Sequence, residues 1–174
     1  MSGRHLLHLA RRLFGMMVPF GPSPADETWV REVLATREHE LWSRMCRADR
    51  RHAAGVARRV QRALGQEATP GVLAAALLHD VGKIDSGLGA YGRVVATVCG
   101  AVASDKTIDA WRRGRGFTRR VGLYLQHARI GSEMLALAGS HPVTVAWARE
   151  HHLPREEWSI PGDIGATLKS ADDD

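Results

Sequence analysis

The stretch "VLAAALLHDVGKID", residues 72–85, places a histidine, an aspartate and a lysine directly after the most apolar run of the chain. Thr69 and Pro70 stand just before it, a pair typical of a helix start. A helix with no polar side is a buried helix, so His79 and Asp80 are expected in the core. Because burying imidazole and carboxylate groups without partners is costly, these two residues need either local partners or a bound cation.

The rest of the chain also divides into helices. It contains no alternating strand pattern with hairpin turns, so we expect an all-α fold. The helix between Asp49 and Gly65 is expected to begin at Asp49 as its cap, and the "WRRGRGFTRR" stretch, residues 111–120, is expected to be an exposed loop. Ser23 with Pro24 is expected to start a helix, and Asp163 is expected to cap the last one. Three further helices are expected from Pro70 to near Gly82, from Ala128 to Gly139, and from Pro142 to His151 and His152.

Length and composition indicate an ordinary globular protein. The chain has 174 residues, which suits one domain with a sizeable core. Its two cysteines, Cys46 and Cys99, are too few for a disulfide framework, and free thiols in a reducing cytoplasm are expected. The formal net charge of +5 favours anionic partners such as nucleotides, nucleic acid or a membrane surface, without choosing among them.

The N-terminal residues 1–24 form a basic, amphipathic segment, and residues 25–174 are expected to form a single domain. Arg11 and Arg12 interrupt the apolar part of this segment, which argues against a secretory signal. We expect the segment to pack as a helix on its own domain, with a helix at a membrane surface as the alternative. No apolar run reaches the roughly 20 residues that a membrane span needs.

Three predicted helices each place one metal-capable residue on an otherwise apolar face, because residues four apart share a face. These faces are His52 with Val56 and Val60, Val143 and Trp147 with His151, and Ile164 and Leu168 with Asp172. A single inward histidine is more often a hydrogen-bonded core residue than a ligand. Several inward histidines with two inward aspartates favour a shared divalent metal site, and a set of nitrogen and oxygen ligands suits Mn, Fe, Co, Ni or Zn.

The order His52, then His79–Asp80, then Asp172 resembles the H…HD…D signature of the HD superfamily of metal-dependent phosphohydrolases. "LLHDVGKID" is similar to the second motif of the family, "RHAAGVARRV" to the helix of the first histidine, and "ADDD" to the closing segment. The resemblance covers residues 44–174 and extends to small, stand-alone bacterial HD proteins. It implies the compact helical fold of an HD domain.

Two further histidines, His127 in "HARIGSEML" and His151 in "REHHL", resemble those of the binuclear HD branches, which include the HD-GYP phosphodiesterases and the dinucleoside tetraphosphate hydrolases. The GYP signature itself is absent, and "LPREEWSIPGD" stands in its place. The resemblance implies two divalent ions bridged by Asp80. By that resemblance one ion is held by His52, His79, Asp80 and Asp172, and the other by His127 and His151. His152 is the weaker alternative, because on a helix it points about 100° away from His151.

The resemblance also implies an activity. Lys83 matches the family's HDxxK lysine, which contacts a substrate phosphate, and Asp80 with Lys83 is expected to be catalytic. We therefore expect a metal-dependent phosphohydrolase that uses a metal-activated water on a nucleotide, a dinucleotide or a related phosphate ester. The alternatives are a nucleotide-sensing HD module with little turnover, a di-iron oxygenase, and a structural protein held at a membrane or nucleic acid by the basic N-terminal helix.

Overall fold

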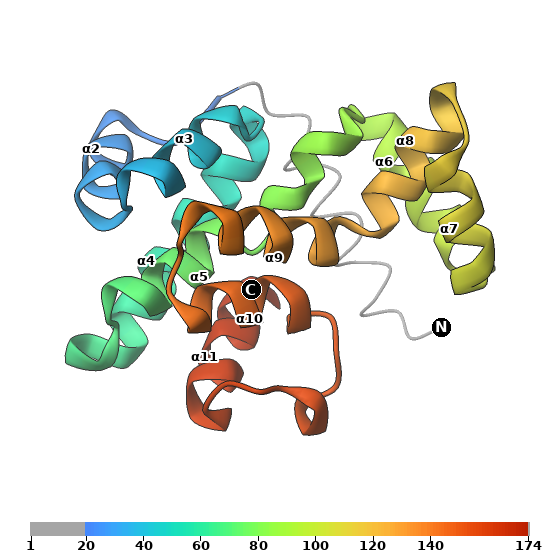
Figure 1. The fold of residues 1–174 in the computed structure, drawn as a ribbon. Helices are drawn as coiled ribbons and strands as arrows, with labels where there is room; N and C mark the ends of the chain where they lie inside the picture. Colours follow the sequence, from blue (N-terminus) through green and yellow to red (C-terminus); the bar gives the residue numbers. More distant parts are fainter. Residues whose placement is uncertain (1–19, 174) are drawn as a thin grey trace.

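The computed structural model describes residues 20–173, which form an all-α fold with no strand among them, as the sequence predicts (Figure 1). Three short 3-10 helices, η1 (Gly65–Glu67), η2 (Val81–Ser86) and η3 (Arg155–Glu157), join longer helices. The α-helices are α2 (Pro24–Val33), α3 (Thr36–Arg44), α4 (Arg47–Leu64), α5 (Pro70–Leu78), α6 (Ala90–Gly100), α7 (Asp105–Arg113), α8 (Gly116–Leu125), α9 (His127–Ala138), α10 (Pro142–Glu150) and α11 (Gly162–Asp173).

Helix α5 lies at the centre of the fold. Every residue from 72 to 78 is buried, as expected for a helix without a polar side. Helices α4 and α10 pack against α5, α11 packs on α4, and α9 packs on both α10 and η2 (Figure 1). The largest fully buried side chains include Trp42, Trp147, Leu77 and Leu168. This core surrounds the point where α5 ends, so whatever follows Leu78 is enclosed by helices.

Local capping chemistry sets several of the helix boundaries. The hydroxyl of Ser23 accepts a hydrogen bond from the backbone N–H of Asp26, and the hydroxyl of Thr69 accepts one from Val72. Each capping residue is followed by a proline at the first helical position, where no N–H is required. Helix α9 ends just before Gly139. These predicted starts and stops are confirmed.

Other predicted boundaries are wrong. Cys46 precedes α4, so Asp49 does not cap that helix but lies in its first turn, and Asp163 likewise lies inside the first turn of α11. Helix α5 ends at Leu78 instead of near Gly82, because the chain tightens there into the 3-10 winding of η2. Helix α10 ends at Glu150, so the two histidines that follow it are outside the helix.

The "WRRGRGFTRR" stretch is not a loop. Helix α7 runs to Arg113 and α8 begins at Gly116, so only two residues connect them. The φ angle of +58° at Gly116 belongs to the left-handed region, which glycine adopts without strain and which makes so short a reversal feasible. The prediction that this stretch is exposed is confirmed for residues 115–120.

Helices α6, α7 and α8, residues 90–125, project from one end of the molecule, and we call them the α6–α8 arm (Figure 1). A small separate cluster of Leu88, Ala96 and Val121 packs inside the arm. Arg93 joins the arm to α4 through two hydrogen bonds to the carboxylate of Asp49, at 2.6 and 2.8 Å. This ion pair, the packing of α8 on η2 and the hydrogen bonds from Arg120 to the carbonyl groups of Ser86 and Gly87 connect the arm to the rest of the fold.

The predicted N-terminal segment lies outside the described residues, except for positions 20–24. Its helical packing and the limits of a single domain at residues 25–174 stay predictions. Within residues 20–173, none of the helices has the length and apolar character that a membrane crossing requires. Cys46 and Cys99 are free thiols, as the sequence indicates.

Candidate metal centre

Six side chains predicted as ligands lie together where α5 ends. They come from five different elements of the fold. The six are His52 from α4, His79 and Asp80 after α5, His127 from the start of α9, His151 after α10 and Asp172 near the end of α11. All are buried except His52, whose side chain is 32% exposed. The structure thus brings the predicted residues together, and their binding of metal stays a prediction.

The first group of these residues lies around His79. Its Nε2 atom is 3.4 Å from Oδ2 of Asp80 and 3.5 Å from Oδ1 of Asp172. The same Asp172 oxygen is 2.8 Å from Nε2 of His52. Potential ligand atoms of His52, His79 and Asp80 all lie within 4.8 Å of one another, close enough to share one ion.

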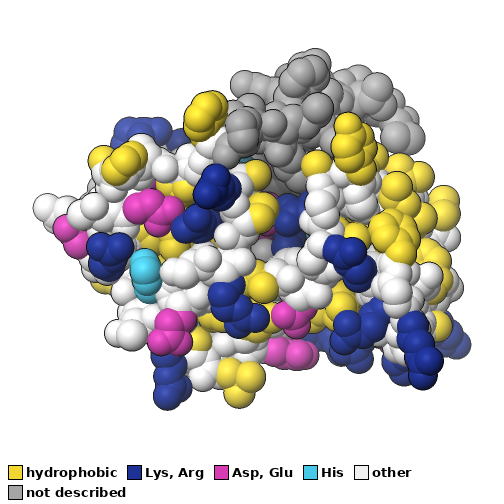
Figure 2. Space-filling view, turned by 90° about the horizontal axis from the view of Figure 1, so that it is seen from above, with side chains coloured by type: hydrophobic (Ala, Val, Ile, Leu, Met, Phe, Trp, Pro, Cys, Tyr) yellow, Lys and Arg dark blue, Asp and Glu magenta, His cyan; other side chains and the backbone are white. Residues whose placement is uncertain are grey.

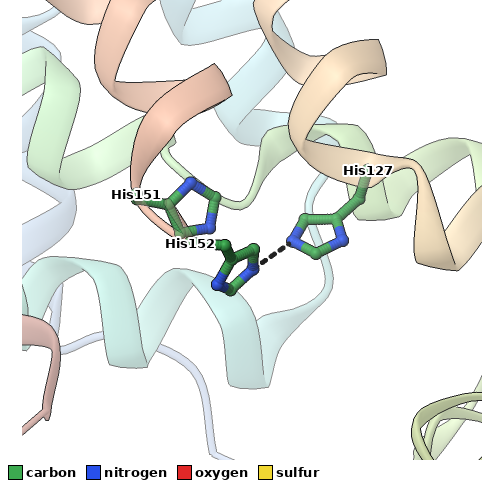
Figure 3. A group of neighbouring side chains, drawn as sticks. All are labelled: His127, His151 and His152. Carbon is green, nitrogen blue, oxygen red and sulfur yellow. Dashed lines mark hydrogen bonds between the residues drawn. The ribbon is translucent and has the colours of Figure 1, made fainter. Parts of the chain in front are cut away.

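The second group consists of His127, His151 and His152 (Figure 3). The rings of His127 and His152 are nearly perpendicular, and their Nε2 atoms lie 3.1 Å apart. The other oxygen of Asp80, Oδ1, is 3.3 Å from Nε2 of His127 and 3.8 Å from Nε2 of His151. Asp80 therefore directs one oxygen to each group. His152, ranked below His151 on a helical angle, also has a ring nitrogen within this group, and whether it or His151 binds a metal stays open.

Backbone carbonyl groups orient three of the histidine rings. The Nδ1 atom of His79 is 3.0 Å from the carbonyl oxygen of Ala76, that of His127 is 2.7 Å from Tyr124, and that of His151 is 3.0 Å from Ala148. A neutral imidazole in this position donates its Nδ1 proton to the carbonyl and keeps a lone pair on Nε2. Histidines that bind metals are commonly held in this way.

The Nε2 atoms of His79 and His151 are buried and have no hydrogen-bond partner within residues 20–173. A buried nitrogen without a partner is unusual and costly in a stable core. Both atoms point toward Asp80, at 3.4 and 3.8 Å. Imidazole nitrogens and carboxylate oxygens are ordinary ligands of divalent transition metals, so this donor set fits such an ion.

A close backbone contact fixes the two groups relative to each other. A Cβ atom added at Gly82, in η2, would lie 2.0 Å from the carbonyl oxygen of His127 and 2.6 Å from the backbone nitrogen of Gly131. Only glycine permits η2 and α9 to approach so closely. This contact holds His127 next to Asp80, two residues before Gly82.

The charges in the centre stabilise one another. Burial lowers the pKa of His79, but Asp80 and Asp172 outweigh burial and raise it to about 10. Burial raises the pKa of Asp80, but Lys83 and His79 hold it well below its usual value. Burial, with help from His152 and His79, keeps the pKa of His151 well below its usual value, so this ring is neutral at pH 7. The aspartates therefore attract positive charge into a site where His151 already has a free lone pair.

Lys83 lies at the edge of the first group and not at a solvated helix end. Its ammonium group donates a hydrogen bond to Oδ2 of Asp80, and its side chain is only 12% exposed. The pKa of Asp49 is also lowered: burial raises it, but hydrogen bonds from Arg93 and the charge of Lys83 outweigh burial. Sequence reasoning missed this Asp49–Arg93 pair, because no local pattern relates residues 44 positions apart.

Three comparisons with known proteins found no match: no protein-family model, no curated protein and no solved structure corresponds to this chain. The case for a metal centre therefore rests on the geometry of the described residues. The HD resemblance rests on the sequence motifs alone.

Proposed function

We propose that this protein is an HD-type metal-dependent phosphohydrolase that acts on a nucleotide, a dinucleotide or a related phosphate ester. One observation carries the proposal. Three histidines with their Nδ1 atoms on backbone carbonyls direct their Nε2 atoms toward Asp80 from two sides. A purely structural role would not need the buried Nε2 atom of His151, which has no hydrogen-bond partner within residues 20–173.

The proposed ligands fall into the two groups described above. His52, His79, Asp80 and Asp172 would hold one ion, and Asp80, His127 and His151 would hold a second, with His152 as a further donor. When bound, such a pair of ions polarises phosphate oxygens and lowers the pKa of a bound water to near neutrality. The all-nitrogen and oxygen donor set suits Fe, Mn, Zn, Co or Ni.

Lys83 and Asp80 are the proposed catalytic residues. Asp80 offers one oxygen to each group, which is the arrangement required of a bridging ligand. Lys83 already lies on one of these oxygens, so its ammonium group is close to where a phosphate would bind. Lys83 would hold a phosphate oxygen as a point charge and offset the negative charge that develops during attack. The partly exposed His52 and the exposed His152 leave an approach for a substrate to each group.

Metal content, measured by elemental mass spectrometry after purification without chelators, tests this proposal first. We expect about two ions per chain in the wild type, loss of most metal in His79→Ala, and loss of one ion in His127→Ala. His39→Ala, which removes a histidine of α3 outside the centre, is the matched control and should retain all metal. A metal-free wild type after growth in metal-replete medium would refute the proposal.

A screen of phosphate esters with the metal-loaded protein separates the alternatives. Hydrolysis that is lost in both Asp80→Ala and Lys83→Ala, with metal retained in Lys83→Ala, supports the hydrolase. Nucleotide binding without turnover on any phosphate would favour the sensing module instead. Oxygen-sensitive colour with redox-active iron would favour the di-iron oxygenase.

A further inference from the structure

The outward face of α6 is apolar and exposed. Tyr91, Val95 and Val98 are 82%, 44% and 63% exposed, and Val102, two residues beyond the helix, is 88% exposed. They recur every three or four residues and therefore share one side of the helix. The opposite side carries the buried Arg93 and Ala96. We call these four exposed residues the α6 stripe.

Nothing in this part of the sequence offsets the apolar stripe with charge. Between Asp85 and Asp105 the only charged residue is Arg93, and its guanidinium is buried against Asp49. An exposed apolar surface of this kind marks an interaction site. The question is which partner it fits.

The charge of the α6–α8 arm answers that question. Residues 90–125 contain seven basic and two acidic residues, a net charge of +5, which equals the formal net charge of the whole chain. Arg113, Arg115 and Arg119 are exposed. Figure 2 shows hydrophobic side chains gathered at the end of the molecule where the arm lies, with Lys and Arg side chains bordering them. Apolar surface and positive charge are therefore adjacent.

We propose that the α6–α8 arm binds the surface of an anionic lipid bilayer, with the α6 stripe in the interface and the arginines on lipid phosphates. An anionic bilayer offers apolar depth and negative charge together. A second copy of the chain would bring two arms of +5 into contact. Residues 1–19 contain three arginines and no acidic residue, so they offer no negative charge to the arginines of the arm. A nucleic acid would satisfy the arginines but not the stripe.

Co-sedimentation of the full chain with vesicles tests this proposal. The probes are vesicles of phosphatidylcholine alone and of phosphatidylcholine mixed with the anionic phosphatidylglycerol. We expect the wild type to bind the mixed vesicles, and Val98→Asp with Val102→Asp to lower the partition coefficient at least about tenfold. Leu137→Asp is the matched control: Leu137 is 82% exposed on α9, outside the arm, and its substitution should leave binding unchanged.

A second variant and three readouts keep the outcome clear. Arg115→Glu with Arg119→Glu should weaken binding to the mixed vesicles while helical content and the melting temperature stay at wild-type values. Binding that persists in the stripe variant but vanishes when residues 1–19 are removed would overturn the proposal in favour of the N-terminal segment. A wild-type dimer that the stripe variant dissociates would also overturn it. A third result would overturn it as well: in the absence of vesicles, residues 90–102 are protected from hydrogen exchange in the full chain but not after residues 1–19 are removed. We expect the metal content to stay at the wild-type value in every variant of this test.

Discussion

The candidate metal centre and the α6–α8 arm depart from the usual distribution of side chains in opposite ways. The centre buries histidines and aspartates, whereas the arm exposes tyrosine and valine. Five elements and the main core hold the centre, while the arm has a small cluster of its own, the packing of α8 on η2 and an ion pair to α4. Both departures are costly for folding alone, so both indicate contact with something besides the chain. The enclosed geometry of the centre suits chemistry, and the exposed apolar surface of the arm suits docking.

The largest expected effect is that of Gly82→Val, which would place side-chain atoms against the backbone of α9. Because the backbone cannot move aside as a flexible side chain can, we expect the free energy of unfolding to fall by more than about 4 kcal/mol. Urea unfolding followed by circular dichroism measures this loss.

Gly55→Ala is the control within α4, where a Cβ atom meets only the end of the Arg59 side chain at 3.4 Å. We expect that change to raise stability by up to about 1 kcal/mol, since alanine favours helices over glycine. Equal losses in both variants would show that the approach of η2 to α9 carries no special constraint.

The next effect concerns the ion pair that joins the two regions. Arg93→Leu leaves the buried Asp49 carboxylate without its partner, and we expect the opening free energy of α6 to fall by about 3 kcal/mol. Hydrogen exchange of the α6 amides measures it. Adding Asp49→Leu should recover most of the loss, because the unpaired charge is then gone. If the α6 amides of Arg93→Leu exchanged hydrogen at the wild-type rate, solvent would already screen this ion pair.

The centre should also make stability depend on pH. His79 has a native pKa of about 10, against an ordinary value near 6.5, so between these values the native state holds a proton that the unfolded state has lost. In the metal-stripped protein, the contribution of His79 to the free energy of unfolding should be fully present at pH values below the ordinary pKa of histidine. It should then fall with rising pH by up to about 1.4 kcal/mol per unit.

Urea unfolding at a series of pH values measures this slope. His79→Gln should flatten it, whereas His39→Gln should not. Bound metal should also flatten it for the wild type, because a metal-bound imidazole is neutral. A wild-type profile as flat as that of His79→Gln would contradict the charged state of His79 in the metal-stripped protein.

The smallest effect compares two equivalent caps. Thr69 caps α5 in the core and Ser104 caps α7 in the arm, each by accepting a backbone N–H. Thr69→Ala should lower the free energy of global unfolding by about 1 kcal/mol. Ser104→Ala should speed hydrogen exchange in α7 and leave global unfolding unchanged, if the arm opens separately. Equal global losses would mean that the arm and the core unfold as one unit.

The sequence predicts what depends on neighbours along the chain. Capping at Ser23 and Thr69 acts over three residues, and the faces of His52, His151 and Asp172 follow from four-residue spacing. The contact between His52 and Asp172 spans 120 residues, so their meeting follows only from packing.

One prediction failed because it extended a local rule too far. The glycines of residues 111–120 suggested a loop, yet they permit a tight turn between two helices. The glycine content of a segment therefore indicates that its backbone can turn, but it does not predict how many residues connect the two helices.

The contact of Gly82 with His127 also bears on how this fold can change. The chain leaves the centre after η2 and returns to it at the start of α9, and that contact pins both points. Between these points the chain runs through α6, α7 and α8, whose outward surface can vary, whereas Arg93, which binds Asp49, and Tyr124, which orients the ring of His127, have to stay. The outer surface of the arm is thus open to replacement by recombination or design, provided that the replacement keeps the inner residues that hold His127 and Asp49.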